Sequence, residues 1–217
     1  MDPFCGCGTT ITVAQRLDRK WIGIDITHLA INLIKWRMKN AFGLEAMKDY
    51  KVVGEPTDLS GARELFSQNR YQFQWWALSL INARPYGDKK KGADTGIDGY
   101  IYYMEGKDII KKVIVQVKGG HVSVSQIRDL IGVMDREKAE LSIFITLEHP
   151  TTKMDEEANI KGFYKFPLGG EYLRVQILTI EELLKGNKPK LPPLKIPSFK
   201  EAERYKREEK TLDLHDK

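Results

Sequence analysis

The sequence predicts an α/β fold in which helices flank a central mixed β-sheet, and three neighbouring segments carry this prediction. Two strand-like runs, Ile97–Met104 and Lys112–Lys118, are separated by turn-forming residues and should pair as an antiparallel hairpin. Apolar residues then recur at helical spacing, which predicts a helix over Val124–Glu137. The short apolar run Leu141–Leu147 is typical of a buried strand. Because the chain crosses over through the helix, this strand should run parallel to Lys112–Lys118.

The remaining elements follow from the same kind of pattern. We expect helices near Gly61–Asn69, at Tyr71–Asn82 and at Met154–Lys161, a strand at Leu173–Thr179 and a short closing helix at Ile180–Leu184. The N-terminal residues predict a glycine loop, a helix, a short strand and a second helix. We divide the chain into residues 1–50, an α/β body of residues 51–186, and a proline-rich and charged tail of residues 187–217.

Composition excludes some classes of protein. Hydrophobic residues make up 41% of the 217, enough for a core, and no apolar run could cross a bilayer. Cys5 and Cys7 lie too close together for an easy disulfide, so we expect free thiols and a cytoplasmic protein. The net charge of +5 modestly favours a polyanionic partner, although a solvated basic surface without function explains it equally well.

The stretch 92–120 holds the strongest candidate for a catalytic site. Asp98 stands at the head of the first hairpin strand, and Gln116 and Lys118 end the second. Alternate residues of a strand share a face, so Gln116 and Lys118 should point the same way, with Val115 and Val117 directed into a core. An acid, an amide oxygen and a lysine gathered at neighbouring strand ends suit a Mg²⁺ site for phosphodiester hydrolysis. A core hydrogen bond to Gln116 and a solvated strand-end lysine are the simpler alternatives.

The pattern G-x-D-x-G-I-D-G followed by Q-V-K resembles the Mrr-like branch of the PD-(D/E)xK nucleases, over roughly residues 71–184. The resemblance implies a restriction-endonuclease-like core that cleaves double-stranded DNA with Mg²⁺. It further implies that Asp98 and Gln116 hold the metal with help from the Val117 carbonyl, and that Lys118 orients the attacking water. A double-strand break by such a site also suggests a homodimer.

One residue departs from the family pattern. Mrr-like proteins usually carry Phe-Glu on the helix before the metal aspartate, and this chain has Phe73-Gln74. The loss of that glutamate leaves the site with fewer negative ligands, unless Glu64 on the preceding helix replaces it. Gln74 therefore places catalysis in question more than it does the fold.

Several polar residues around the hairpin are candidates for contacts with DNA. They are Lys89, Lys90, Lys91, His121, Gln126 and Arg128. A solvated loop explains the three lysines about as well, and a single histidine in a loop is usually incidental.

The N-terminal segment DPFCGCGTT, followed by RKWIGIDI, resembles the end of an amino-group DNA methyltransferase, which implies a partial Rossmann-like fragment. The resemblance implies that the glycine loop cradles S-adenosylmethionine and that an acid at the end of the next strand binds its ribose. The candidate cofactor residues are Asp2, Phe4, Gly6, Gly8, Thr9 and Asp25. The methyltransfer motif, an acid, Asn or Ser before Pro-Pro and an aromatic residue, does not occur in the sequence. We therefore expect no methyltransfer from this chain alone, and cofactor binding stays open.

We interpret the chain as a Mg²⁺-dependent restriction endonuclease fused to a methyltransferase remnant. One alternative is a domain that grips DNA without cutting it, which the substitution at Gln74 favours. A second is a subunit of a split DNA methyltransferase that a separate partner chain completes. A third is a defective fragment without activity.

Overall fold

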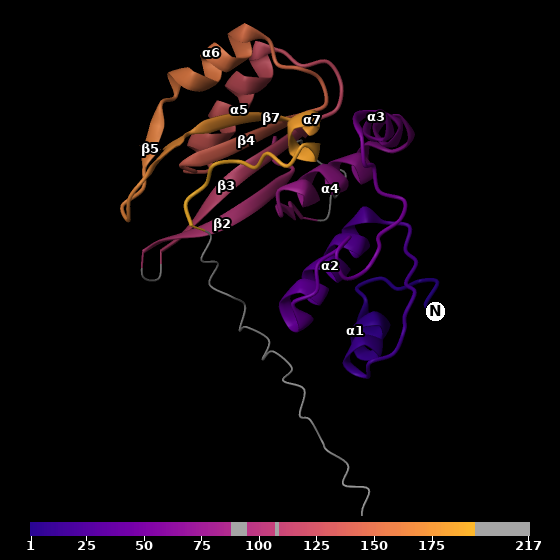
Figure 1. The fold of residues 1–217 in the computed structure, drawn as a ribbon. Helices are drawn as coiled ribbons and strands as arrows, with labels where there is room; N and C mark the ends of the chain where they lie inside the picture. The colour runs from indigo at the N-terminus through magenta and orange to yellow at the C-terminus, as the bar shows by residue number, and fades with distance from the viewer. Residues whose placement is uncertain (88–94, 107–108, 194–217) are drawn as a thin grey trace, which may run out of the picture. The chain divides into compact units, whose positions relative to one another are not determined.

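A five-stranded mixed sheet forms the centre of the larger of two compact units in the chain (Figure 1). The computed structural model describes residues 1–87, 95–106 and 109–193. The strand order is β1-β2-β3-β4-β7. The strands are β1 (Arg84–Pro85), β2 (Gly99–Gly106), β3 (Ile109–Lys118), β4 (Leu141–Thr146) and β7 (Val175–Thr179).

The pairing of the strands confirms the predicted mixed α/β sheet. β1, β2 and β3 are antiparallel neighbours, with Gly99 opposite Val115. β3 and β4 are parallel, with Val115 opposite Ile143, and β7 continues the parallel part. Every residue of β4 is buried, because helices cover both faces of the sheet and the strand has a neighbour on each side.

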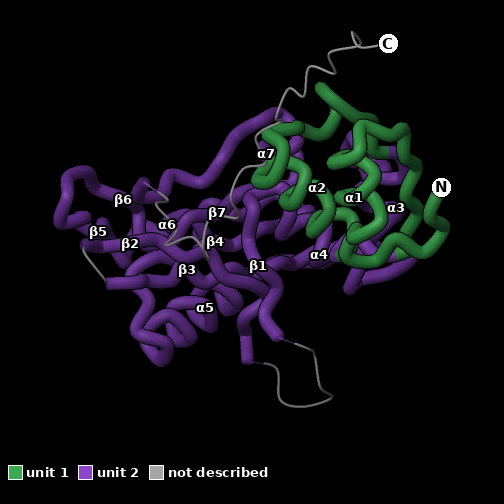
Figure 2. The backbone as a smooth tube through the Cα atoms, turned by 90° about the horizontal axis from the view of Figure 1, so that it is seen from below, with its two compact units in different colours: residues 1–26, 30–52, 199–217 green, residues 27–29, 53–198 purple. Residues whose placement is uncertain are grey.

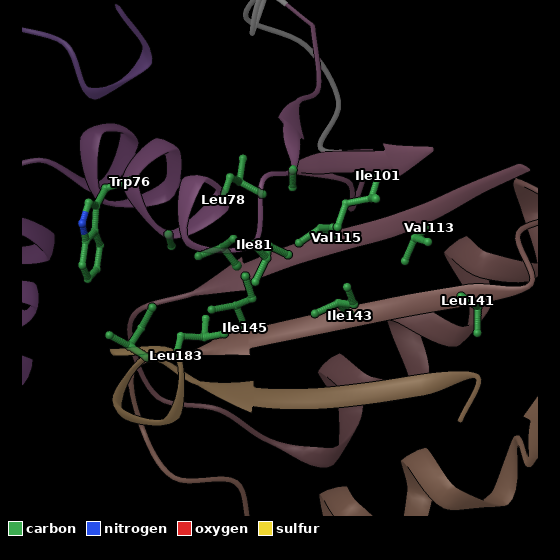
Figure 3. Close-up of a cluster of buried hydrophobic side chains, with 14 of the residues drawn as sticks. Trp76, Leu78, Ile81, Ile101, Val113, Val115, Leu141, Ile143, Ile145 and Leu183 are labelled. Atoms are coloured by element: carbon green, nitrogen blue, oxygen red, sulfur yellow. The ribbon is translucent and has the colours of Figure 1, made fainter. Parts of the chain in front are cut away.

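Two layers of helices cover the two faces of the sheet. The helices are α3 (Leu59–Gln68), α4 (Arg70–Leu80), α5 (Val124–Arg136), α6 (Thr152–Ile160) and α7 (Ile180–Leu184). α3, α4 and α7 pack with Val113, Val115 and Val117 of β3 in one core cluster, part of which Figure 3 shows. α5 and α6 pack on the other face with Ile114 and Phe144. β3 therefore sends its odd-numbered residues into the first core, as the sequence predicts for Val115 and Val117.

The C-terminal half differs from the prediction in the strand expected at Leu173–Thr179 and in β5 (Phe163–Lys165), which was not predicted. The expected strand Leu173–Thr179 is divided into β6 (Glu171–Leu173) and β7, and the break falls at Arg174. β6 pairs with β5 in a separate two-stranded sheet, whereas β7 pairs with β4. The Arg174 N–H donates to the Gly162 carbonyl, and its own carbonyl accepts from Ser142, so the chain changes sheets at this residue.

The chain forms two compact units, coloured separately in Figure 2. The described part of the first comprises residues 1–26 and 30–52, and that of the second comprises residues 27–29 and 53–193 with the gaps given above. The boundaries predicted at residues 50 and 186 stay a prediction. Within the described residues, no helix is both long enough and apolar enough to cross a membrane.

The first unit contains α1 (Thr9–Arg16) and most of α2 (His28–Phe42), around a small core of Cys5, Ile11, Ile34 and Met38. The prediction of a short strand between the two helices is wrong in its length. The structure has only a single parallel β-bridge there, between Asp2 and Gly23. A strand needs a partner along its length, and within the described residues Asp2 supplies only this one bridge partner.

Candidate functional site

The hairpin brings Asp98 to the end of β3. The Asp98 N–H donates to the Val115 carbonyl at 2.9 Å, and the Asp98 carbonyl accepts from the Tyr86 N–H at 2.9 Å. These two backbone bonds hold Asp98 between the β1 and β3 sides of β2. Its Oδ2 accepts the backbone N–H of Val117 at 2.8 Å. The neighbourhood of Asp98 and the end of β3 is thus as the sequence predicts, although Val117 turns its N–H, and not a metal-binding carbonyl, toward the acid.

Gln74 reaches the same carboxylate from the helix layer. Asn69 caps α4 by accepting the N–H groups of Tyr71 and Gln72, which fixes where the helix begins. Gln74 lies one turn further on and is only 7% exposed. Its Nε2 donates a hydrogen bond to Asp98 Oδ1. We call Asp98, Gln74 and Val117, which join α4 to β2 and β3, the Asp98 junction.

Gln116, the residue before Val117 in β3, is buried and only half satisfied. Its side chain is 5% exposed, and its Nε2 donates to the Gly96 carbonyl at 3.3 Å. Its Oε1 is buried and has no hydrogen-bond partner among the described residues. The amide nitrogen of Gln116 is therefore hydrogen-bonded, whereas its amide oxygen is buried without a donor from the described residues.

Lys118, half-exposed at the end of β3, has no ion pair or side-chain hydrogen bond with another described residue. Most cations of this unit are neutralised by a neighbouring acid. The described pairs include Arg63–Glu148, Lys112–Glu137, Arg128–Glu157, Lys161–Asp135, Arg174–Glu140 and Lys185–Glu181. Lys118 is therefore a half-exposed cation at the end of β3 without an acidic partner in the described part of the chain.

The other predicted DNA contacts are spread over different environments. Gln126 accepts the Ser123 N–H at 3.1 Å as part of the cap of α5, and Arg128 pairs with Glu157 at 2.9 Å. His121 is exposed, with its carbonyl 3.5 Å from Gln126 Nε2. The predicted basic loop of residues 89–91 lies outside the described residues.

These side chains do not fit a Mg²⁺ centre. Mg²⁺ is normally held by one or two carboxylates in octahedral oxygen coordination, with waters completing the shell. Here Asp98 is the one carboxylate of the Asp98 junction, and each of its oxygens accepts a hydrogen bond from the chain. Glu64 is exposed and accepts from Gln68 Nε2 at 2.9 Å. In the described parts of the chain, no three His, Cys, Asp or Glu side chains gather where they could hold a metal ion.

The glycine loop of the first unit is held together by the acids that were candidates for cofactor binding. Asp25 Oδ2 accepts the Gly6 N–H at 2.9 Å, and Asp2 Oδ1 accepts the Phe4 N–H at 3.1 Å. Gly8 begins α1 with φ of +79°, and a Cβ there would lie 2.5 Å from Ile34 Cγ1. Both the backbone conformation and the close packing therefore require glycine at this position.

Two of the candidate cofactor residues of this loop lie on the surface. Phe4 is 89% exposed, and Thr9 is also exposed. Cys5 and Cys7 are free, as predicted. Burial raises the pKa of the Cys5 thiol, whereas a hydrogen bond with Thr9, 3.4 Å away, lowers the pKa of the exposed Cys7 thiol.

The role of Gln74 is the main feature that the motif analysis did not predict. The sequence identifies the residue as a departure from the family pattern, but not as a hydrogen-bond partner of Asp98. The available signal was its position within the apolar run Phe73-Gln74-Trp75-Trp76, since a glutamine inside a buried stretch must bond to something.

The fold is a mixed α/β domain with a five-stranded sheet flanked by helices, and it follows a smaller N-terminal unit. Residues 63–185, more than half of the chain, match the family model described as NACHT-associated inactive Restriction Endonuclease 1, and the chain belongs to this family. Residues 1–36 match a DNA methylase model. The restriction-endonuclease and methyltransferase resemblances are thus confirmed in their broad form, and the assignment to the Mrr-like branch stays a prediction.

Individual relatives match over a short stretch. Over 50 residues, which make up 23% of this chain, the sequence is 46% identical to the type II methyltransferase M.EcaI of Enterobacter cloacae. It is 44% identical over 55 residues, 25% of this chain, to the type II methyltransferase M.BamHI of Bacillus amyloliquefaciens. The chain spans 11% of the length of each. No solved structure matches the chain significantly.

Proposed function

We propose that residues 63–185 form a domain that binds DNA without cutting it, in a restriction–modification setting. The observation that carries this proposal is the state of Asp98. The carboxylate that would have to carry the metal instead accepts hydrogen bonds from the Gln74 amide and the Val117 backbone. The family description, which names an inactive endonuclease, supports the same conclusion.

Mg²⁺-dependent hydrolysis by Asp98, Gln116 and Lys118 is the second candidate. Gln116 Oε1 and the Lys118 ammonium, which have no partner among residues 1–87, 95–106 and 109–193, favour it because both groups could serve a phosphodiester substrate. A cation that entered this site would, however, have to share Asp98 with the Gln74 amide and the Val117 N–H. The first proposal requires no such sharing.

Cleavage is tested with supercoiled plasmid DNA and either Mg²⁺ or Mn²⁺. We expect the wild-type chain to nick no faster than Asp98→Ala or Lys118→Ala. Wild-type nicking that both substitutions abolish would overturn the proposal and establish hydrolysis at the predicted residues.

Binding is tested by fluorescence anisotropy with a labelled duplex over a range of salt concentrations. Each phosphate contact contributes about 0.9 to the slope of log K against log salt, so Lys118→Ala should lower the slope by about that amount. Lys153→Ala is the matched control, since Lys153 is exposed on α6 and forms no ion pair with a described residue. Equal slopes for wild type and Lys118→Ala would remove Lys118 from the interface, and an absence of binding at low salt would reject DNA as the partner.

The N-terminal fragment calls for a separate measurement. We propose that it binds no S-adenosylmethionine by itself, because Asp25 is bonded to the loop that it was expected to complement and Phe4 is open to solvent. Calorimetry with the cofactor tests this expectation. Saturable binding that Asp25→Ala abolishes would favour a subunit of a split methyltransferase. A homodimer and a cytoplasmic location also stay predictions.

A further inference from the structure

Three tyrosine rings form a row across β1 and β2, at the antiparallel end of the sheet. Tyr100 and Tyr102 are alternate residues of β2 and therefore share a face, and Tyr86 follows directly after β1. The ring centroids of Tyr86 and Tyr100 are 5.3 Å apart, and those of Tyr100 and Tyr102 are 6.0 Å apart. We call Tyr86, Tyr100 and Tyr102 the tyrosine row.

The tyrosine row lies on a part of the sheet that the helices cover incompletely. Tyr100 packs against the core cluster beneath α5 and α6, and it is the residue of β2 that does so. Tyr102 belongs to neither core cluster that the described residues form in this unit. Tyr86 is 39% exposed and Tyr102 is half-buried. The two outer rings therefore reach solvent, while the middle ring anchors the row to the core.

Cationic side chains border the tyrosine row on the same face. Residues opposite one another in an antiparallel pair share a face of the sheet. Lys112 is opposite Tyr102, and its Nζ lies 5.4 Å from the centroid of the Tyr100 ring. Arg84, which is exposed, is opposite Tyr100 in the pairing of β1 with β2. The middle ring therefore has one cation beside it from β1 and another from β3.

The end of α5 adds a third cation and an acid. The Arg136 side chain is 54% exposed, and its Nη2 donates to the Thr95 carbonyl at 2.7 Å. Glu137 accepts a hydrogen bond from Lys112 at 2.7 Å and lies 3.4 Å from Arg136 Nε. One acid thus offsets part of the charge of three cations. Burial and the Glu137 carboxylate raise the pKa of Tyr100 to about 12, so this ring adds no negative charge at pH 7.

Solvent-accessible aromatic rings beside cations are suited to the bases of a single strand. Bases stack on aromatic side chains with little dependence on sequence, and cations nearby attract the phosphates that join them. The faces of a base inside a duplex are covered by its neighbours in the stack, so such a base must be extruded before it can contact a ring. The chemistry of the tyrosine row therefore favours unpaired nucleic acid over a duplex.

We infer that the tyrosine row is a contact surface for unpaired DNA bases, with Tyr86 and Tyr102 as the stacking residues and Arg84 and Arg136 near the phosphates. The inference rests on the proposed binding of DNA and adds a form of the substrate to it. Lys118 contacts phosphate in the proposed function, whereas the tyrosine row contacts bases that are not paired.

The experiment measures the binding of a labelled oligothymidylate of about 12 nucleotides by fluorescence anisotropy at constant salt. Stacking of one base is worth about 1 to 3 kcal/mol, so Tyr102→Leu should weaken binding by about 5- to 150-fold. Tyr102→Phe keeps the ring and should bind within about twofold of the wild type. Tyr86→Leu should also weaken binding, and it tests the inference by itself if Tyr102→Leu does not fold.

A matched control is available on the opposite face of the sheet. Tyr71 is 56% exposed at the start of α4, which packs on the other core cluster. Tyr71→Leu makes the same chemical change away from the tyrosine row and should leave the affinity for the oligothymidylate unchanged. Circular dichroism and urea unfolding establish that each variant is folded before its affinity is compared.

Photocrosslinking locates the contact directly. An oligomer that carries 5-iododeoxyuridine in place of thymidine reacts on irradiation with aromatic side chains against which its bases stack. Mass spectrometry of the digested product should place the crosslink at Tyr86 or Tyr102. Crosslinks confined to residues outside the tyrosine row would overturn the inference.

Three results of the binding measurement would also overturn it. The first is a wild-type protein that does not bind the oligothymidylate at low salt. The second is equal affinity of the wild type and of folded Tyr86→Leu and Tyr102→Leu. The third is binding of the matching RNA oligomer, oligouridylate, more than about tenfold tighter than that of the DNA oligomer, which would reject DNA as the strand.

The duplex measurement with Lys118→Ala tests the proposed function separately. A protein that binds duplex DNA through Lys118 but ignores the oligothymidylate would keep the proposed function and defeat the inference. Binding of the oligothymidylate that depends on the tyrosine row, without binding of the duplex, would support the inference and reject the role of Lys118 at a duplex.

Discussion

Replacing Asp98 by alanine should destabilise the protein, because the carboxylate serves the fold. Asp98→Ala removes the acceptor of the buried Gln74 amide and of the Val117 N–H. An unsatisfied buried polar group costs about 1 to 3 kcal/mol, which gives about 2 to 6 kcal/mol for the two. Asp98 is itself half-exposed, so water can reach part of the space it leaves. We therefore expect a loss of about 2 to 4 kcal/mol in the free energy of unfolding.

The assay combines urea unfolding with hydrogen exchange. Urea gives the change in free energy from the shift in midpoint at constant slope. Exchange of the Val117 amide reports the junction itself, and it should become faster in Asp98→Ala by more than the global loss of stability explains. The matched control is Asp135→Ala, since Asp135 is 60% exposed and pairs with Lys161 at 2.8 Å. A surface pair of this kind should change stability by less than about 1 kcal/mol.

The result that refutes this reasoning is a variant as stable as the wild type or more stable. Carboxylates that are held in place for a ligand are usually strained in its absence, and their removal often stabilises a protein. A neutral or stabilising Asp98→Ala would therefore indicate that Asp98 is kept for a cation or a substrate and that its hydrogen bonds contribute little.

Two further predictions concern packing and pH. Gly119→Ala should lower the free energy of unfolding by about 1 to 3 kcal/mol, because a Cβ at this position would lie 2.3 Å from Phe66 Cδ2. Gly120→Ala is the control and should be nearly neutral in the same urea assay, because a Cβ there would lie 3.9 Å from the nearest Phe66 atom. A hydrogen bond from Lys112 lowers the pKa of Glu137. The ionised Glu137 therefore stabilises the folded protein at any pH above the ordinary glutamate pKa, and this contribution is lost as the pH falls through the lowered pKa. Lys112→Met should therefore flatten the fall in stability between roughly pH 5 and pH 3, and an unchanged acid limb would contradict the assignment.

The sequence predicts the central elements well because their signals are local. The hairpin, the helix after it and the apolar strand Leu141–Leu147 follow from turn residues and hydrophobic periodicity, and the crossover rule then fixes the direction of β4. β3 begins at Ile109, three residues before its predicted start. Its first residues pair with β2 while remaining exposed, so no buried pattern marks them.

Elements whose partners lie far away in the sequence were harder to predict. β1 contains Pro85, which argues against a strand unless the residue lies at an edge, and β1 is the edge of the sheet. The division of Leu173–Thr179 depends on Arg174 bonding to Gly162 and Ser142. No local pattern reveals a change of sheet inside a continuous β-rich run.

The candidate site shows the same limit. Asp98 was expected beside the end of β3 because the hairpin register is local, and its carboxylate accepts the Val117 N–H, whereas the Gln116 side chain bonds to Gly96. The hydrogen bond from Gln74 depends on where α4 lies against β2, which periodicity does not give. Sequence reasoning could therefore locate the carboxylate but not determine which group it serves.

Both acids that the sequence assigns to ligands are bonded to the chain's own backbone. Asp25 accepts the Gly6 N–H and Asp98 accepts the Val117 N–H, each within the motif that a cofactor or metal was expected to occupy. A carboxylate in this role keeps the local fold even when no ligand binds, because it satisfies a donor that would otherwise be lost. The motifs can therefore persist in a chain without either chemistry, and the presence of Asp25 and Asp98 alone is weak evidence for activity. At Asp98 the Gln74 amide is a second donor to the carboxylate, so both carboxylate oxygens contribute to the local fold.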